Sequence, residues 1–313
     1  MILTVTLNPS VDRALDVDAL IRGEVIRAAD SHIDPGGKGV NVSRALLANG
    51  VSSTAVVPAG GAEGDQLVDL LKGEGVDMLA VPIAGRTRSN ITLAEPNGTV
   101  TKVNEAGPTL SDAEFAQVSD AVLAAAGSAD WVVICGSLPP GPTIAAFTDL
   151  CERLVKSGSR LAVDSSGPAL LAGVAAGAAL IKPNREELAE AAGTELATLG
   201  DVIRACQRLR EAGAGTVLAS LGAAGAVLVD DAGVLAGASP VSVPRSTVGA
   251  GDALLAGFLA AGARGEAALV EGLAWGAAAV SLPGSRMPGP QDLDRTSIRI
   301  DLFPDPGRPL RRD

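Results

Sequence analysis

From about residue 110 onward, the chain alternates apolar segments of strand length with segments of helical spacing. Trp131–Ile134 is apolar along its whole length, and helices are predicted at Ala113–Ala126 before it and Ile144–Ser157 after it. A strand with no polar face must be buried on both sides, as in parallel sheets whose crossover helices cover both faces. The sequence therefore predicts an α/β fold with a mostly parallel central sheet.

The first hundred residues depart from this alternation. The segment Val11–Arg27 is polar and predicts short strands, and Arg88–Leu93 and Val100–Asn104 alternate polar and apolar residues around the turn Asn97-Gly98, which predicts a hairpin. We expect this hairpin to form a flap at the edge of the fold. No internal repeat or linker is found, so residues 1–303 are expected to form a single domain, followed by a flexible tail at 304–313.

Composition excludes several classes of function. The net charge of −11 argues against a nucleic-acid partner and against a basic membrane-binding patch. The chain starts without a basic leader, has no apolar run of about 18 residues and has no C-x-x-C motif among its three cysteines, so we expect a cytoplasmic protein. Its only histidine, His32, excludes any site that needs two and is expected in a half-exposed loop.

The sharpest motif is Thr247-Val-Gly-Ala-Gly-Asp252, directly before an apolar helix predicted at Ala253–Ala261. Glycines at a helix start expose N–H groups that bind anions. A carboxylate in the same turn repels phosphate, but it suits a base that takes a proton from an attacking hydroxyl. Asp252 is therefore a candidate catalytic base, and a simple helix cap is an equally good interpretation.

A second glycine-rich segment, Asp34-Pro-Gly-Gly-Lys-Gly-Val-Asn41, is not a Walker A loop, because Lys38 is followed by Gly39 instead of Ser or Thr. It places a lysine and an asparagine beside bare backbone, which suits a small anionic ligand. A flexible turn with a solvated lysine is the alternative.

Four weaker motifs accompany these two. Lys182-Pro-Asn-Arg-Glu-Glu187 has the spacing of a capping box, and Asn184 and Glu187 could instead orient water around Mg²⁺. The others are Ser220-Leu-Gly-Ala-Ala-Gly225, which could line a nucleotide; Gly136-Ser-Leu-Pro-Pro-Gly141 with Asp164, at the carboxyl ends of predicted strands; and Arg86, Arg88 and Asn90 on the flap.

Taken together, the motifs resemble the ribokinase/PfkB family of carbohydrate kinases from residue 1 to about residue 285. The resemblance rests on Pro35–Asn41, Ser220–Gly225 and Thr247–Asp252, in that order and separation. Within the family, the segments Thr4–Asp12, Arg88–Asn90, Ser137–Gly141 and Lys182–Asn184 are similar to the branch of 1-phosphofructokinases and tagatose-6-phosphate kinases.

The resemblance implies a three-layer α/β/α domain with a small β-sheet lid from about residues 11–32 and 86–104, and a homodimer that pairs through the lid. It implies ATP and Mg²⁺ as cofactors. It also implies that Asp252 is the base and that Gly249, Ala250 and Gly251 form the anion hole. The sugar would be bound by Asp12, Gly37, Asn41 and Ser137, and its phosphate by Lys38 and Arg88, with Asn90 nearby. ATP would be bound by Lys182, Asn184, Ser220, Gly222, Gly225 and Gly251, and the metal would be held through water by Asn184 and Glu187.

The implied reaction transfers the γ-phosphoryl group of ATP to the 6-hydroxyl of D-fructose 1-phosphate. Tagatose-6-phosphate kinase and 6-phosphofructokinase are alternatives within the same fold, because sequence does not fix the placement of sugar hydroxyls. A non-catalytic sugar- or nucleotide-binding regulator is less favoured, because Asp252 and its glycine turn are both present. A dehydrogenase of the Rossmann type is disfavoured, because no G-x-G-x-x-G follows the first strand.

Overall fold

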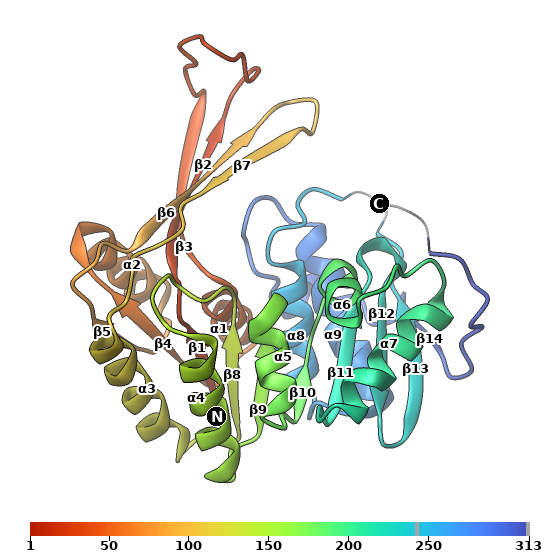
Figure 1. Ribbon diagram of the computed structural model, residues 1–313. Coiled ribbons are helices and arrows are strands. Elements are labelled where there is room, and N and C mark those ends of the chain that lie inside the picture. Colours follow the sequence, from red (N-terminus) through yellow and green to blue (C-terminus); the bar gives the residue numbers. More distant parts are fainter. Residues whose placement is uncertain (242–243, 311–313) are drawn as a thin grey trace.

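The computed structural model describes residues 1–241 and 244–310, and its main feature is a ten-stranded sheet (Figure 1). In spatial order its strands are β14 (Arg299–Asp301), β13 (Gly233–Ala238), β12 (Ala226–Asp230), β11 (Thr216–Ser220), β10 (Leu180–Ile181), β9 (Leu161–Asp164), β8 (Trp131–Cys135), β1 (Ile2–Thr6), β4 (Ser53–Ala59) and β5 (Met78–Pro82). The seven strands from β11 to β5 are parallel, and β12, β13 and β14 extend the sheet antiparallel. The predicted mostly parallel sheet is confirmed.

Helices cover both faces of this sheet. Along β8, Trp131 and Val133 pack into one apolar cluster, whereas Val132 and Ile134 pack into another on the opposite face. The first face carries α1 (Lys38–Ala48), α2 (Gly61–Glu74), α8 (Ala250–Ala260) and α9 (Gly265–Val280). The second carries α3 (Asp112–Ala126), α4 (Ile144–Lys156), α5 (Gly167–Ala175), α6 (Arg185–Ala192) and α7 (Leu199–Glu211). The fully apolar strands thus have the double burial that their sequence predicts.

A second sheet projects away from the body of the molecule (Figure 1). Its four strands, in spatial order, are β3 (Asp30–Gly36), β2 (Ser10–Asp16), β6 (Arg88–Ala94) and β7 (Val100–Asn104). We call this sheet the lid. It is built from the two segments for which the sequence predicts a lid, and Asp12 on β2 lies directly opposite Asn90 on β6. His32, which is expected in a loop, lies instead on β3 and is exposed.

Several details differ from the sequence-based prediction. The strand β10 has two residues instead of the five expected at 178–182, and β5, α5 and β14 are not predicted at all. The prediction of a flexible tail at 304–313 is wrong for its inner part: the carbonyls of Pro306 and Arg308 accept hydrogen bonds from the first turn of α7, and Leu310 is buried in the apolar cluster. Residues 311–313 lie outside the described part of the chain. None of the helices described is both long and apolar enough to cross a membrane.

Candidate active site

The parallel strands bring polar side chains together at one edge of the large sheet. Strands β1, β8, β9 and β10 are neighbours in the same orientation, so their carboxyl ends meet there. Asp164 is the last residue of β9, and Lys182 directly follows β10. This edge is where open α/β sheets bind their ligands, and the residues of the sequence motifs converge on it.

Asp252 lies in the first turn of α8, in the interior of the protein. The helix starts after Gly249, which has a left-handed φ of 75°, and a Cβ there would come within 2.6 Å of Met287. The first N–H groups of a helix have no partner within it, so this turn presents donors to an anion. The helix-cap interpretation of Asp252 is not supported, because no side chain of residues 1–241 and 244–310 caps α8 and the carboxylate accepts instead from Asn41 Nδ2 at 2.8 Å.

A second buried carboxylate, Asp164, lies between two lysines. Its Oδ1 is 2.9 Å from Lys38 Nζ, and its Oδ2 is 3.0 Å from Lys182 Nζ. Lys182 in turn approaches the start of α8, since a Cβ on Gly251 would lie 3.5 Å from its Nζ. Asp164 therefore holds two cations at this edge of the sheet, and one of them lies beside the N-terminus of α8.

The two carboxylates have opposite electrostatic settings. Burial, assisted by the charge of Asp164, raises the pKa of Asp252 to about 6. Burial has the same tendency at Asp164, but there the charges of Lys182 and Lys38 prevail and keep its pKa below the ordinary value. Opposite shifts in neighbouring acids distinguish a group that can take a proton near neutral pH from one that stays ionised.

Lys38 connects the buried carboxylates to α6. Its Nζ is 3.3 Å from Glu187 Oε1 as well as 2.9 Å from Asp164. Burial alone would lower the pKa of Lys38, but the charges of Asp164 and Glu187 raise it above its ordinary value. Glu187 also completes the predicted capping box, because Asn184 Oδ1 accepts from the Glu187 N–H and Glu187 Oε2 accepts from the Asn184 N–H, both at 2.8 Å. The capping role of this pair is therefore present, and one carboxylate oxygen faces the site.

A cavity of about 250 Å³ opens beside Lys38. It is lined by Thr6, Asn8, Gly37, Lys38, Arg88, Asn104, Gly136, Ser137, Ser166 and Glu187. Its cations differ in their partners. Lys38 is paired with two carboxylates, whereas the Arg88 guanidinium donates to the carbonyls of Asn8 and Glu105, and no carboxylate of the described residues lies within 4.0 Å of it. Burial lowers the pKa of Arg88. A desolvated guanidinium without an anion suits a phosphate.

The base of the lid carries a cluster of polar side chains that includes an unsatisfied acceptor. Asp12 Oδ1 accepts from Ser10 Oγ at 2.6 Å and from Asn90 Nδ2 at 2.9 Å. The Asn90 Oδ1 is buried and has no hydrogen-bond partner in the part of the chain that the structure describes. Gly36 makes room for this group, because a Cβ there would lie 2.4 Å from the Asp12 carboxylate. Unsatisfied buried acceptors are rare in folded proteins. Asn90 lies opposite Asn104 on the neighbouring strand, and Asn104 lines the cavity, so the acceptor is near a place where a ligand with O–H donors could bind.

The predicted nucleotide segment lies next to the capping box. Ser220 and Asn184 form an isolated parallel bridge, and the Ser220 N–H donates to the Pro183 carbonyl at 3.0 Å. The turn closes when Leu221 N–H donates to the Gly225 carbonyl. Gly225 has a φ of 92° and allows the turn to touch β13, since a Cβ would be 2.0 Å from the Gly237 carbonyl oxygen. Residues 182–187 and 220–225 therefore lie side by side.

The structure brings most predicted site residues to this edge, with two differences in detail. Asn41, predicted on the sugar, is bonded to Asp252, and Arg86 lies apart on the surface, paired with Glu63 and Glu105. Sequence reasoning placed Asp164 only on the rim and gave no role to Asn8, which lines the cavity. The position of Asp164 at the end of an apolar strand is the signal for its place in the site, whereas nothing in the local sequence reveals that Asn8 lines the cavity.

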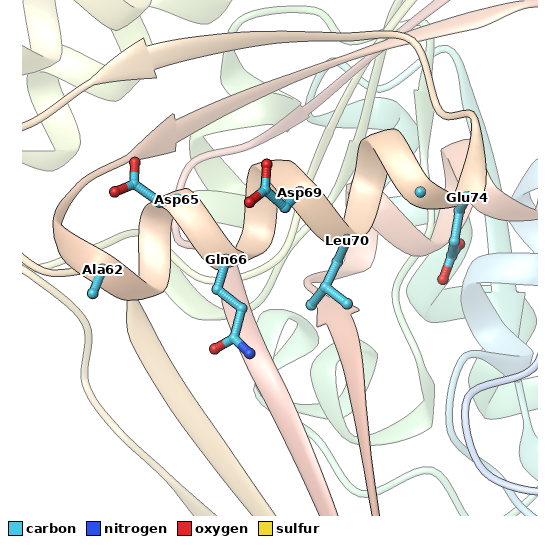
Figure 2. Close-up of a pocket in the computed structure, with 7 residues that line it drawn as sticks. Ala62, Asp65, Gln66, Asp69, Leu70 and Glu74 are labelled. Atoms are coloured by element: carbon cyan, nitrogen blue, oxygen red, sulfur yellow. The ribbon is translucent and has the colours of Figure 1, made fainter.

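A larger hollow of about 770 Å³ lies on α2 (Figure 2). Its lining residues are Ala62, Asp65, Gln66, Asp69, Leu70, Gly73 and Glu74. Three of these are carboxylates and none is a lysine or arginine, so the hollow repels phosphate. The volume of a cavity therefore does not identify the active site in this protein. The smaller cavity, which is lined by Lys38 and Arg88, is better suited to bind phosphate.

Three comparisons with known proteins identify relatives of this chain. The model of the "pfkB family carbohydrate kinase" matches residues 5–292. The chain is 38% identical to ATP-dependent 6-phosphofructokinase isozyme 2 of Escherichia coli (91% of this chain, 94% of the relative) and 38% identical to 1-phosphofructokinase of Rhodobacter capsulatus (84% of each). The crystal structure of phosphofructokinase-2 from Escherichia coli in complex with substrates and products superposes with a TM-score of 0.88 at 38% identity, over 93% of this chain and 96% of that one.

Proposed function

Because the chain belongs to the pfkB family of carbohydrate kinases, we propose that it transfers the γ-phosphoryl group of ATP to the 6-hydroxyl of D-fructose 1-phosphate. The family and the ribokinase-like fold implied by the sequence motifs are confirmed. The choice of fructose 1-phosphate follows the curated 1-phosphofructokinase that the chain resembles and the branch-specific segments of its sequence.

The observation that carries the proposal is the setting of Asp252. Its pKa of about 6 leaves it largely ionised at neutral pH and still basic enough to accept a proton. It stands in the turn that opens α8, where helix N–H groups favour an anion. Lys38 contributes to both parts of the site, because its charge acts on Asp252 and its side chain lines the cavity.

The reaction then follows from these positions. The 6-hydroxyl of the sugar attacks the γ-phosphorus in line, its proton passes to a carboxylate oxygen of Asp252, and the bond from the γ-phosphorus to the β,γ-bridging oxygen breaks to release ADP. Backbone N–H groups of Gly249, Ala250 and Gly251 hold the charge of the transferred group. Lys182, beside the same turn, neutralises charge on the donor phosphates. Asn41 keeps the carboxylate of Asp252 in place.

We assign ATP binding to the adjacent segments Lys182–Glu187 and Ser220–Gly225. Mg²⁺ bound beside these segments would neutralise phosphate charge. The donor set fits such an ion through water, since Asn184 and Glu187 offer amide and carboxylate oxygens but already use part of their capacity in the capping box.

We further propose that two copies pair through the lid and that the enzyme works in the cytoplasm. Ile91 on β6 lies opposite Val103 on β7, and Ile33 on β3 lies in the same cross-strand row. All three side chains are exposed, and Arg13 of β2 lies between Ile33 and Ile91 in the row, so this lid face presents exposed apolar residues around one arginine in a single chain. Ile91→Asp should convert a dimer to a monomer in analytical ultracentrifugation, and a wild-type monomer at micromolar concentration would contradict the pairing.

An ADP-release assay tests the main proposal. Fructose 1-phosphate, fructose 6-phosphate, tagatose 6-phosphate and unphosphorylated fructose are offered at equal concentrations with ATP and Mg²⁺. We expect the highest kcat/KM with fructose 1-phosphate. A preference for fructose 6-phosphate or tagatose 6-phosphate would instead indicate a 6-phosphofructokinase or a tagatose-6-phosphate kinase. If none of the four sugars is phosphorylated, the proposed function is contradicted.

A further inference from the structure

Arg44, near the middle of α1, is a buried arginine three residues beyond the glycine-rich segment that ends at Asn41. Its Nε and Nη2 donate to the two carboxylate oxygens of Glu74, the last residue of α2, at 2.6 and 2.8 Å. Its remaining nitrogen, Nη1, donates to the Ser285 carbonyl at 3.2 Å and to Asn41 Oδ1 at 3.5 Å. The guanidinium therefore links α2 and the loop after α9 to Asn41.

Asn41 is the connection between this guanidinium and the candidate base. It lies one helical turn before Arg44 on the same face of α1, and both side chains are buried. Its Nδ2 donates to Asp252 Oδ2 at 2.8 Å, whereas its Oδ1 accepts from Arg44. Each half of the amide thus has its own partner, and the two partners lie on opposite sides of it.

The orientation of this amide matters because a carboxamide can donate from its nitrogen or accept at its oxygen. The ionised carboxylate of Asp252 can only accept, so it pairs with Nδ2. The protonated carboxyl group can donate to Oδ1 if the amide turns over. A guanidinium is always protonated and has no acceptor, so it pairs only with the amide oxygen. An amide held by Arg44 therefore favours the ionised form of Asp252.

The guanidinium is itself fixed from several elements. The bidentate pair with Glu74 sets its plane, and Ser285 binds it from the loop after α9. Asp34 Oδ1, on β3, lies 3.8 Å from Nη2. An arginine bound to three other segments of the chain is a rigid donor, so it can hold a neighbouring amide in one orientation.

We propose that Arg44 is a positioning residue for the base: it holds the Asn41 amide with its oxygen turned away from Asp252, so that the amide nitrogen faces the carboxylate. This inference rests on the proposed function, which makes Asp252 the base. Arg44 acts through Asn41 and not on the substrate. Without Arg44 the amide can turn and accept from protonated Asp252, so the base should keep its proton to a higher pH.

Other groups that carry charge or titrate also surround Asp252. They are Lys38 on α1, Cys135 on β8, Asp164 on β9 and Lys182 after β10. On α9 and in the loop that follows it, Glu271 is paired with Arg295, and Glu266 and Arg286 are exposed. Substitutions at Arg44 leave all of these groups in place. A changed titration of Asp252 then reports either the contact with Asn41 or the charge of Arg44 itself.

The first test compares the pH profile of kcat at saturating substrates in the wild type, Arg44→Met and Glu74→Gln. Methionine has a long side chain without an N–H donor. We expect its acid limb to move to higher pH by about half a unit to one unit, the size expected for one hydrogen bond to a carboxylate. Glu74→Gln removes the ion pair between α1 and α2 but keeps the contact of Arg44 with Asn41. It should lower the Tm without moving the limb, and an equal shift in both variants would show that Arg44 serves only the packing of the helices.

The double variant Arg44→Met/Asn41→Ala separates positioning from direct charge. If Arg44 acts through Asn41, Arg44→Met should shift the limb in the wild type and add nothing when Asn41 is already alanine. An equal shift with and without the Asn41 amide would show that the charge of Arg44 acts on Asp252 directly, and would overturn the inference.

Arg44→Lys keeps the proposal testable if Arg44→Met folds poorly. Lysine retains the charge and can pair with Glu74, but one ammonium cannot also take the place of Nη1 beside Asn41. The acid limb should therefore still move to higher pH. A folded Arg44→Lys with the wild-type limb would show that a charge is sufficient, which contradicts positioning by the guanidinium.

A measurement without substrate separates this inference from the proposed function. The carboxyl ¹³C resonance of Asp252, identified by its loss in Asp252→Asn, follows the titration directly. A wild type that phosphorylates no ketose phosphate contradicts the proposed function, and the ¹³C titration still tests Arg44. If Asp252 titrates at the same pH in the wild type, Arg44→Met and Arg44→Lys, the role of Arg44 is overturned whatever the substrate.

Discussion

The two ends of the active site are built in different ways. At the transfer end, the buried charges have partners within the protein: Asp252 is bonded to Asn41, and Asp164 is paired with Lys38 and Lys182. At the proposed sugar-phosphate end, Arg88 has only carbonyl partners among the described residues, and the side-chain oxygens of Asn8 and Asn90 have no hydrogen-bond partner there. We therefore expect the first end to be electrostatically complete before substrate binds and the second to be completed by the substrate.

This difference follows from the elements that carry each end. The transfer end is held by strand ends and helix starts of the body, which the large sheet and its helices fix. The sugar end is formed by the turn after β1 and by the base of the lid. A preorganised transfer end supplies stabilisation of the transition state, whereas contacts that form only with the ligand supply binding. Substitutions at the two ends should therefore change different kinetic constants.

The largest effect should come from Asp252→Asn. Loss of the base should lower kcat by about 1,000-fold, while the affinity for ATP changes little, because the turn and Lys182 remain. Single-turnover assays and direct ATP binding measure the two quantities. Near-normal turnover would remove Asp252 as the base and with it the assigned transfer end.

The same variant should be more heat-stable at pH 8. Folding raises the pKa of Asp252 from 3.8 to about 6, so the favourable contribution of its protonated form is complete below pH 3.8 and is lost as the pH rises through 6. At pH 8 the wild type carries a destabilising buried charge that the neutral amide does not. A Tm that falls at pH 8 would indicate that Asp252 is needed for the fold instead of for chemistry.

The next largest effect should be at Arg88. Arg88→Ala should raise KM for the sugar phosphate by roughly 10- to 100-fold and leave KM for ATP almost unchanged, because it removes an unpaired cation from the sugar end only. Lys38→Ala should also raise KM for the sugar phosphate much more than KM for ATP. It should lower kcat as well, because it takes one of two cations from Asp164. Initial-rate kinetics with each substrate varied in turn measure these effects, and an increase confined to KM for ATP would show that the phosphate contacts are misassigned.

The sequence predicts the transfer end better than the sugar end, for a physical reason. Thr247–Asp252 and Lys182–Glu187 form the site by local geometry, a glycine turn into a helix and a capping box, and local geometry is visible in spacing. The buried pairing of Asp164 with two lysines depends on the order of β9, β10 and β1 in the sheet. The unused oxygens of Asn8 and Asn90 depend on contacts across about 80 to 100 residues, such as Asn8 with Ala106. Tail residues 306–310 illustrate the same limit, because a segment rich in Pro and Arg gives no local sign of the backbone pairing with α7.

The smallest effect, and the most specific, should come from Asn41→Ala. The Asn41 amide donates to the ionised carboxylate and so lowers the pKa of Asp252, against burial and Asp164, which raise it. Without that donor the pKa should rise, and the base should be protonated at a higher pH. The acid limb of kcat, expected near pH 6 in the wild type, should therefore move to higher pH in the variant.

Two features of the experiment isolate this shift. The sugar phosphate also titrates near pH 6, but its titration is the same for both enzymes, so the difference between their profiles at saturating substrate belongs to the protein. Asn41→Asp provides a further contrast, because a second carboxylate beside Asp252 should move the limb further than alanine does. If Asn41→Ala instead leaves the acid limb of kcat unchanged and raises only KM for the sugar phosphate, Asn41 contacts the sugar. It must then be assigned to the sugar end instead of the transfer end.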